Sequence, residues 1–268
     1  MNKHDLIYLA DLNHAESMRE TGRWKADSEI LEQDDLLMVA GGDKSPATNS
    51  AIRIGDHSRP PADEIMDRVR DYFGSKERGY SLYIRRHLDP DLEHLCLSAE
   101  MVKISESPGM SIQEPIRMKD LPSGITIKII EDKSGAVDFA SVAIDSYQSL
   151  GMPQKIGEKI FSTPERMLRP YNHLVVAYLD GRPVSAAMLL FSHAIAGIYW
   201  VGTVESARKK GLAEACTGFV TNEGFRRGAP CVILQASQFG EPIYRRLGFK
   251  EFTRYPWYMH FAKKSGRR

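Results

Sequence analysis

One order of elements is predicted twice along this chain: strand, helix, strand, helix, strand. It covers residues 50–116 and again residues 195–261. In both places short apolar or β-branched runs alternate with segments whose apolar residues recur at helical spacing. The two copies share no evident sequence identity, so their relation depends on the order of elements alone. The pattern predicts a mixed α and β protein with two related halves.

The remaining elements are predicted from periodicity and from turn residues. Helices are expected at 1–35, 61–74, 89–99, 135–150, 153–169 with a break near Pro164, 211–228 and 241–247. Strands are expected at 36–40, 50–55, 80–85, 101–107, 110–116, 125–132, 195–204, 231–237, 249–261 and twice within 173–191, around Asp180-Gly181. Pro108-Gly109 is expected to form a turn, and 118–124 to connect two domains.

The longest uncharged stretch is predicted to be two strands and not a membrane helix. No Asp, Glu, Lys or Arg occurs from Pro183 to Val204, and a membrane helix needs about 20 apolar residues. However, proline, serine and glycine residues interrupt the stretch, and a turn near His193 divides it into two strands. No membrane association is therefore expected.

Charge and cysteine content argue against several other classes of protein. The net charge is +1, so no general basic field is available for nucleic acid, and the basic tail 263–268 is expected to be solvated. The three cysteines are far apart and the eight histidines lack metal-ligand spacing, which argues against disulfides and metal sites. The N-terminus is also polar by residue 11 and has no apolar signal core. These features together predict a cytoplasmic protein without a metal.

The segment with the clearest chemistry is WVGTVESARKKGLAEA, residues 200–215, where a strand ends and a helix begins at Gly211. The first N–H groups of a helix have no partner within it, and the helix dipole favours an anion there. Gly211 has no Cβ to block that anion, and Arg208, Lys209 and Lys210 add positive charge. A pyrophosphate would fit, although an ordinary β–α turn with solvated basic residues has the same composition. The absence of a Walker loop and of G-x-G-x-x-G argues against nucleoside triphosphates and dinucleotides.

A second segment, SQFGEPIYRRLGF at 237–249, follows the next predicted buried strand. Tyr244 lies near the middle of its short helix, five residues before Phe249. Such a tyrosine is usually a core aromatic whose hydroxyl is hydrogen-bonded. Its place after the basic loop allows a second interpretation.

Residues 125–262 resemble the GNAT acetyltransferase superfamily. The R/Q-x-x-G-x-G/A signature of that superfamily is matched by Arg208, Gly211 and Ala213, and its later tyrosine before a Gly-Phe pair is matched by Tyr244. The order of elements also agrees: strand, two helices, three antiparallel strands, helix, strand, helix, strand. The resemblance implies the GNAT acyl-CoA N-acyltransferase fold, an α+β (mixed α/β) fold with a mostly antiparallel central sheet flanked by helices, preceded here by a GNAT-like lobe.

The resemblance also implies roles for individual residues. Arg208, Lys209, Lys210, Gly211, Leu212 and Ala213 would hold the coenzyme A pyrophosphate through backbone N–H groups. Val201 and Thr203 would hydrogen-bond the pantetheine arm like an added strand, and Ser237 would contact the same arm. Tyr244 would protonate the departing thiolate, since a phenol with a pKa of about 10 keeps its proton at pH 7.

The chain departs from the superfamily pattern, and one catalytic group stays open. Lys209 and Ala213 stand where glycine is frequent, and a proline common before the loop is absent. Because the contacts use backbone groups, these departures put the affinity for the coenzyme in doubt and not the fold. The base that takes the proton of the amine is not visible: the candidates are Glu205, Glu241, His193, Asp145 and a water molecule.

The chain is predicted to divide into an N-terminal α/β lobe at 1–120, a degenerate GNAT-like copy, and a catalytic GNAT domain at 121–268. In the first copy the loop after the strand at 50–55 is DHSRPPADE, where Pro60 and Pro61 offer no N–H and two acidic residues would repel phosphate. We therefore expect that this lobe does not bind coenzyme A. This lobe is expected either to pack on the C-terminal lobe and line the acceptor site, or to mediate homodimer formation.

Together these features predict an acetyl-CoA-dependent N-acetyltransferase that needs no metal. An amine of a small molecule or a peptide would attack the thioester directly. No acyl-cysteine is expected, because Cys216 and Cys231 lie in predicted core segments. Two alternatives stay open: a non-catalytic acyl-CoA-binding or regulatory module, and an acyltransferase that uses another acyl group.

Overall fold

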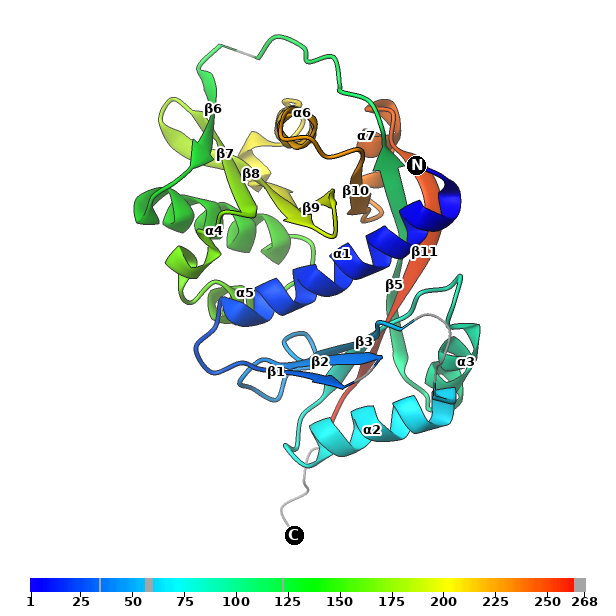
Figure 1. Cartoon of the computed structure of the whole chain (residues 1–268). Helices are drawn as coiled ribbons and strands as arrows, with labels where there is room; N and C mark the ends of the chain where they lie inside the picture. The colour runs from blue at the N-terminus through cyan, green and yellow to red at the C-terminus, as the bar shows by residue number, and fades with distance from the viewer. Residues whose placement is uncertain (34, 56–59, 122, 263–268) are drawn as a thin grey trace. The chain divides into compact units, whose positions relative to one another are not determined.

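The computed structural model describes residues 1–33, 35–55, 60–121 and 123–262, which form two compact units (Figure 1). Unit 1 comprises residues 1–26 and 109–252, and unit 2 comprises residues 27–108 and the chain from 253 onward. This division differs from the expected halves 1–120 and 121–268 at both ends of the chain. The first helix belongs to unit 1 because its apolar residues are buried against strands of that unit, and the last strand belongs to unit 2 because it pairs with a strand there.

The sheet of unit 1 has the strand order β5–β10–β9–β8–β7–β6. Its strands are the end of β5 (Val102–Ile112), then β6 (Ile125–Ile130), β7 (Asn172–Leu179), β8 (Arg182–Ser192), β9 (Ile195–Thr203) and β10 (Val232–Gln235). Neighbouring strands are antiparallel except β9 and β10, which are parallel. Both residues of the hairpin turns Asp180-Gly181 and His193-Ala194 have positive φ, as two-residue hairpins of type I′ require. The predicted hairpins and the mostly antiparallel sheet are confirmed.

Helices cover both faces of this sheet. One face carries α4 (Lys133–Gln148), α5 (Gln154–Ile160) and the short 3-10 helix η1 (Pro164–Met167), and α1 (Lys3–Arg23) lies across β8 and β9 (Figure 1). The other face carries α6 (Leu212–Arg226) and α7 (Glu241–Arg246). Cys216 and Cys231 are fully buried, and burial raises the pKa of each thiol to about 11, so both are core residues as predicted.

The sheet of unit 2 has the strand order β1–β2–β3–β4–β11. Its strands are β1 (Glu29–Gln33), β2 (Leu36–Ala40), β3 (Ser50–Arg53), β4 (Tyr80–Tyr83) and β11 (Lys250–His260), whose last residues pair with β4. β3 and β4 are parallel and the other neighbours are antiparallel. The helices α2 (Ala62–Gly74) and α3 (Pro90–Ser98) pack with this sheet around one apolar core that includes Phe73 and Leu82.

Two predicted elements are wrong. The helix expected over 1–35 ends at Arg23, beside the buried Trp24, and residues 29–33 form β1 because they pair with β2. Pro108 and Gly109 lie inside β5 and form no turn. The pairing of β5 with β10 begins at Gly109, so that ladder does not need the N–H group that Pro108 lacks. The predictions for the tail 263–268 and for residues 56–59 lie outside the described residues. In the described chain, no helix combines the length and apolar character needed to cross a bilayer.

Candidate active site

The two parallel strands of unit 1 separate before β9 ends. β9 and β10 pair as far as Ile198 and Leu234, and β9 then continues to Thr203 with no paired β10 residue. Val204 donates its N–H to β8 at 3.0 Å, and backbone groups of alternate strand residues point to opposite sides. The N–H and C=O groups of Thr203 and Val201 therefore point away from β8. They line the edge that β10 has left, and we call this opening the β9–β10 gap.

The start of α6 presents unpaired backbone groups close to this gap. Gly211 is the N-cap of α6 with a φ of +75°, and a Cβ on it would meet no atom within 4 Å. The Ala215 N–H makes a helical hydrogen bond of 2.9 Å to the Gly211 carbonyl. The N–H groups of Leu212, Ala213 and Glu214 precede that bond and have no acceptor within the helix. A left-handed glycine and open space thus let an anion reach these groups.

The three basic residues of the loop have different surroundings. The Arg208 guanidinium donates to the Thr203 carbonyl of β9 at 3.2 Å, to the Ser146 carbonyl at 3.3 Å and to the Ser149 hydroxyl. Of the edge groups of Thr203, the N–H therefore remains for a ligand. Lys209 and Lys210 are exposed. Arg208 therefore ties the loop to α4, and the two lysines supply the exposed positive charge of the loop.

Tyr244 lies on α7 and is buried in the core between α6, α7 and the sheet. Its ring packs edge-on against Phe249, with centroids 6.0 Å apart, and a Cβ on Gly240 would lie only 2.7 Å from the ring. Burial raises the pKa of Tyr244 far above its ordinary value, and the nearby phenol of Tyr147 raises it further. Tyr147 belongs to α4, on the opposite face of the sheet.

Ser237 helps to shape the turn that precedes α7. Its hydroxyl oxygen accepts the N–H of Gly240 at 3.1 Å, and its carbonyl accepts the N–H groups of Gly240 and Glu241. The hydroxyl proton remains available for donation. Ser237 thus combines a structural contact with one donor that a ligand can use.

The candidate general bases are exposed to solvent or are engaged with other groups. Glu205 is exposed in the short 3-10 helix η2 (Glu205–Ala207), and Asp145 is exposed on α4. Glu241 accepts a hydrogen bond of 2.7 Å from Arg245. His193 occupies the hairpin turn at the opposite end of β9 from Thr203. A water molecule remains the simplest acceptor for the proton of the amine.

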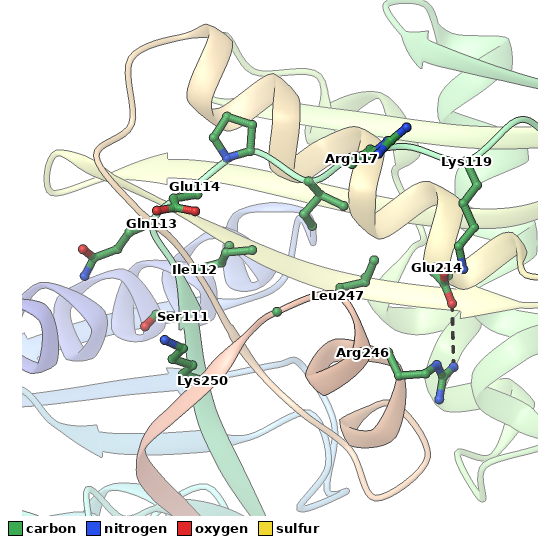
Figure 2. A pocket seen from close by; sticks show the side chains of 13 residues that line it. Ser111, Ile112, Gln113, Glu114, Arg117, Lys119, Glu214, Arg246, Leu247 and Lys250 are labelled. Atoms are coloured by element: carbon green, nitrogen blue, oxygen red, sulfur yellow. Dashed lines mark hydrogen bonds and ion pairs between the residues drawn. The ribbon is translucent and has the colours of Figure 1, made fainter.

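A pocket of ≈ 850 Å³ adjoins the first turn of α6 (Figure 2). Its charged lining residues are Glu114, Arg117, Lys119, Glu214, Arg246 and Lys250, so basic side chains outnumber acidic ones. Glu214 accepts a hydrogen bond of 2.8 Å from Lys119 and lies 3.7 Å from Arg246. The pocket extends the positive surroundings of the loop towards the end of α7.

Sequence reasoning missed this pocket and the groups on α4. The pocket residues come from three separated segments, so no local motif announces them. One signal for the close approach of α4 to β9 does exist in the sequence. Gly202 interrupts a strand pattern, and a glycine there often marks a close approach of another segment. A Cβ on Gly202 would lie 2.0 Å from the Ser146 hydroxyl and 3.6 Å from the Tyr147 ring.

No family model matches the sequence, and the search of curated proteins finds no relative. Solved structures do match. A GCN5-related N-acetyltransferase from Kribbella flavida has a TM-score of 0.70 and 18% identity, with 96% of each chain covered. A GCN5-related N-acetyltransferase from Sphaerobacter thermophilus has a TM-score of 0.64 and 15% identity, covering 89% of this chain and 84% of that chain.

A further match is a tandem GNAT protein from the clavulanic acid biosynthesis pathway, in a structure without AcCoA. Its TM-score is 0.61 at 12% identity, with 90% of this chain and 86% of that chain covered. The chain therefore has the GNAT fold, preceded by a GNAT-like lobe, as the sequence predicts. In the described residues, no group of three or more His, Cys, Asp or Glu side chains is arranged to hold a metal ion.

Proposed function

We propose that this protein is an acetyl-CoA-dependent N-acetyltransferase that transfers the acetyl group to an amine. The observation that carries the proposal is the β9–β10 gap, whose edge presents the backbone groups of Val201 and the N–H of Thr203. An amide-bearing pantetheine arm can add to such an edge as an extra strand. A diphosphate can meet the N–H groups around Gly211. The likeness to solved N-acetyltransferases supports the same reaction class.

The charge around the loop supports binding of the phosphate-bearing end of the coenzyme. Lys209 and Lys210 are exposed beside the start of α6, and the basic pocket adjoins the first turn of that helix. Coenzyme A carries a diphosphate and a further phosphate, so its affinity should depend on these side chains and on salt. The backbone N–H groups would fix the position of the diphosphate, and the basic side chains would add attraction over a longer range.

Tyr244 would complete the transfer. The amine nitrogen attacks the thioester carbonyl, the C–N bond forms and the C–S bond breaks. The departing sulfur takes the Tyr244 proton, water takes the proton of the amine, and solvent returns a proton to Tyr244. The raised pKa of Tyr244 keeps this phenol protonated at neutral and mildly alkaline pH.

The test measures binding and turnover separately. Calorimetry with acetyl-CoA gives the affinity, and a thiol-release assay with a panel of primary amines gives the rate. Binding together with amine-dependent thiol release supports the proposal. Binding without release across the panel would indicate the regulatory module instead. Release that is faster with a longer acyl-CoA than with acetyl-CoA would indicate a different acyl donor.

Tyr244→Phe tests the proposed acid. The variant should bind acetyl-CoA with unchanged affinity and lose about 10²-fold or more in turnover, the lower end of the usual effect of a positioned acid. Phe249→Leu is a matched control, because it changes the ring partner of Tyr244 but keeps the hydroxyl. Turnover of Tyr244→Phe equal to that of the native protein would remove Tyr244 from this role.

The thiols support a proposal for the compartment. Cys96, Cys216 and Cys231 are all free and buried. A chain without disulfides suits a reducing environment, which supports a cytoplasmic location as part of this proposal.

A further inference from the structure

The α4 face of unit 1 carries aromatic residues beside the β9–β10 gap. The register between β8 and β9 shifts between Ala186 and Met188, and at this bulge Trp200 has a φ of +53°. A left-handed conformation is strained for a bulky residue. The bulge places Tyr199 and Trp200, neighbours in sequence, in the same cluster with α4 and α5. Strain of this kind is often retained where a side chain has a function.

Four aromatic rings pack together at this bulge. The Trp200 ring centroid lies 4.9 Å from that of Phe161, 5.2 Å from that of Tyr147 and 6.1 Å from that of Trp24. Trp24 and Phe161 are 0% and 3% exposed and belong to the core. Trp200 and Tyr147 keep part of their surface exposed. We call this outer pair the aromatic wall.

The aromatic wall stands next to the edge where the thioester would lie. The Tyr147 ring approaches β9 at Gly202, within 3.6 Å of where a Cβ would be, and Gly202 separates Val201 from Thr203. On the other face, Val201 packs into the cluster that contains Tyr244. Because α6, α7 and this core fill that face, an amine has to approach from the face of α4.

One cation, the guanidinium of Arg208, is held beside the aromatic wall. The Arg208 guanidinium donates to the Ser146 carbonyl and to the Ser149 hydroxyl, which flank Tyr147 along α4. Asp145 precedes Tyr147 by two residues, about 200° around the helix, and is exposed. A fixed cation disfavours an acceptor with several positive charges, whereas two aromatic rings favour a flat apolar one.

We propose that Tyr147 and Trp200 set the acceptor specificity, and that the acceptor is a primary amine joined by a short linker to an aromatic or flat apolar group. This inference rests on the proposed acetyl transfer and names its acceptor class. The ring of the acceptor packs on the aromatic wall, and the nitrogen reaches the β9–β10 gap. The nitrogen forms the new C–N bond and loses one proton, and the coenzyme leaves as a thiol.

The experiment compares three amines as acceptors with saturating acetyl-CoA: 2-phenylethylamine, hexylamine and spermidine. The value of kcat/KM should be highest for 2-phenylethylamine, at about 10-fold or more above spermidine, which corresponds to about 1.4 kcal/mol. Trp200→Ala should raise KM for 2-phenylethylamine about 10-fold with a smaller effect for hexylamine, because a pair of aromatic rings is stabilised beyond the burial of apolar area. The affinity for acetyl-CoA should stay unchanged.

Matched variants separate specificity from folding. Tyr8→Ala removes an exposed aromatic ring of α1 and should leave all three KM values unchanged. If Trp200→Ala fails to fold, Trp200→Leu serves instead, since it keeps apolar bulk and should still raise KM for 2-phenylethylamine more than KM for hexylamine. Tyr147→Ala removes the second ring of the aromatic wall and should also raise KM for 2-phenylethylamine more than KM for hexylamine.

The outcomes distinguish this inference from the proposed function. A native protein that does not bind acetyl-CoA overturns the proposed function. A native protein that binds acetyl-CoA and acetylates spermidine preferentially overturns the acceptor class alone. Turnover with 2-phenylethylamine that is insensitive to Trp200→Ala overturns the role of the aromatic wall.

Discussion

The two strand–helix–strand–helix–strand repeats of this chain share their topology and differ at one point. In the second repeat the parallel pair β9 and β10 separates after Ile198, and β9 continues to Thr203. In the first repeat the parallel pair β3 and β4 holds together as far as Ile52, and β3 ends one residue later, at Arg53. The second repeat therefore has an unpaired strand edge, and the first repeat lacks the length of strand to form one.

The corresponding end of the first repeat is occupied by the protein's own charged side chains. Arg85, just past β4, donates to the Asp89 carboxylate at 2.7 Å and to the carbonyl of Gly55 at 2.9 Å. The buried Arg53 lies 3.6 Å from both Asp35 and Asp89. We call these four charged residues the ion cluster. Arg85 therefore links the chain just past β4 to the chain just past β3. The equivalent strands of the second repeat, β9 and β10, separate instead.

The helix starts differ in the same direction. The N-cap of α6 is the left-handed Gly211, with exposed lysines before it. The N-cap of α2 is Pro61, and its first turn carries Asp63 and Glu64. The acidic residue in the first turn of α6, Glu214, is paired with Lys119. A carboxylate satisfies a helix dipole that an anionic ligand would otherwise satisfy. The same topology thus supports a ligand site in the second repeat, where β9 extends beyond β10 and the helix begins at a glycine. In the first repeat, where the chain supplies its own partners, it supports a structural cluster.

The largest expected effect comes from Asp89→Ala, which tests whether the ion cluster is structural. Asp89 is fully buried, and its removal leaves the guanidinium groups of Arg53 and Arg85 without its charge. The free energy of unfolding should fall by about 3–5 kcal/mol, the usual result of breaking a buried pair. Urea denaturation measures this change, and calorimetry should give an unchanged Kd for acetyl-CoA.

Asp67→Ala is the control for that variant. Asp67 pairs with Arg70 on the surface of α2, with an exposed carboxylate, and its loss should cost less than about 0.5 kcal/mol. If Asp89→Ala does not fold, Asp89→Asn keeps the shape and removes only the charge. A loss below about 1 kcal/mol in both Asp89 variants would contradict a structural ion cluster.

The second effect is on coenzyme affinity. Lys209→Glu combined with Lys210→Glu should raise the Kd for acetyl-CoA about 10- to 100-fold at low salt, and the difference should shrink as salt screens the charges. Both lysines are exposed, so the free energy of unfolding should change by less than about 0.5 kcal/mol. Lys3→Glu combined with Lys155→Glu makes the same change in net charge at two exposed positions on other helices, α1 and α5. Equal losses of affinity in the two double variants would argue against the loop as the site.

The third effect separates backbone strain from binding. Gly211 and Gly181 have φ values of +75° and +79°, and a Cβ on either would meet no atom within 4 Å. Valine at either position should therefore cost a similar amount, about 1–2 kcal/mol of stability. Only Gly211→Val should also weaken acetyl-CoA binding, because only Gly211 precedes the unpaired N–H groups of α6. Thermal unfolding and calorimetry on the pair give both quantities, and equal Kd values would contradict the proposed site.

Local features of this fold were predictable from the sequence, and features built by distant segments were not. The hairpin at Asp180-Gly181, the helix start at Gly211 and the buried Tyr244 follow from residues that are neighbours in the chain. The exchange of the first helix and the last strand between the units depends on contacts across most of the chain length. The meeting of Trp200 with Tyr147 likewise depends on a bulge that no turn residue marks.

Some features of the first repeat could be predicted from its sequence, and others could not. Pro60, Pro61 and the acidic residues after them predict a loop that does not attract phosphate, and that expectation needs only the order of residues. The ion cluster could not be anticipated, because Asp35 and Asp89 reach Arg53 from separate segments. Sequence patterns therefore indicate where a ligand is disfavoured, and packing decides what takes its place.

The smallest expected effect concerns the far ends of the two repeat helices. Near the end of α6, the Glu223 carboxylate accepts hydrogen bonds from Arg226 at 2.6 and 2.7 Å and a further one from Arg227, and these guanidinium groups lower its pKa to about 2. The last turn of α2 has no basic residue.

Because the pKa of Glu223 is lower in the folded than in the unfolded chain, this stabilisation is present above about pH 4.5 and is lost as the pH falls towards 2. Glu223→Gln should lower the free energy of unfolding by about 1 kcal/mol at pH 7, because solvent screens the Arg226 and Arg227 side chains, which are 65% and 39% exposed. The difference between native and variant unfolding free energies should narrow at pH 3. A gap that is the same at both pH values would show that Glu223 acts through packing and not through charge, and this helix end would then no longer distinguish the two repeats.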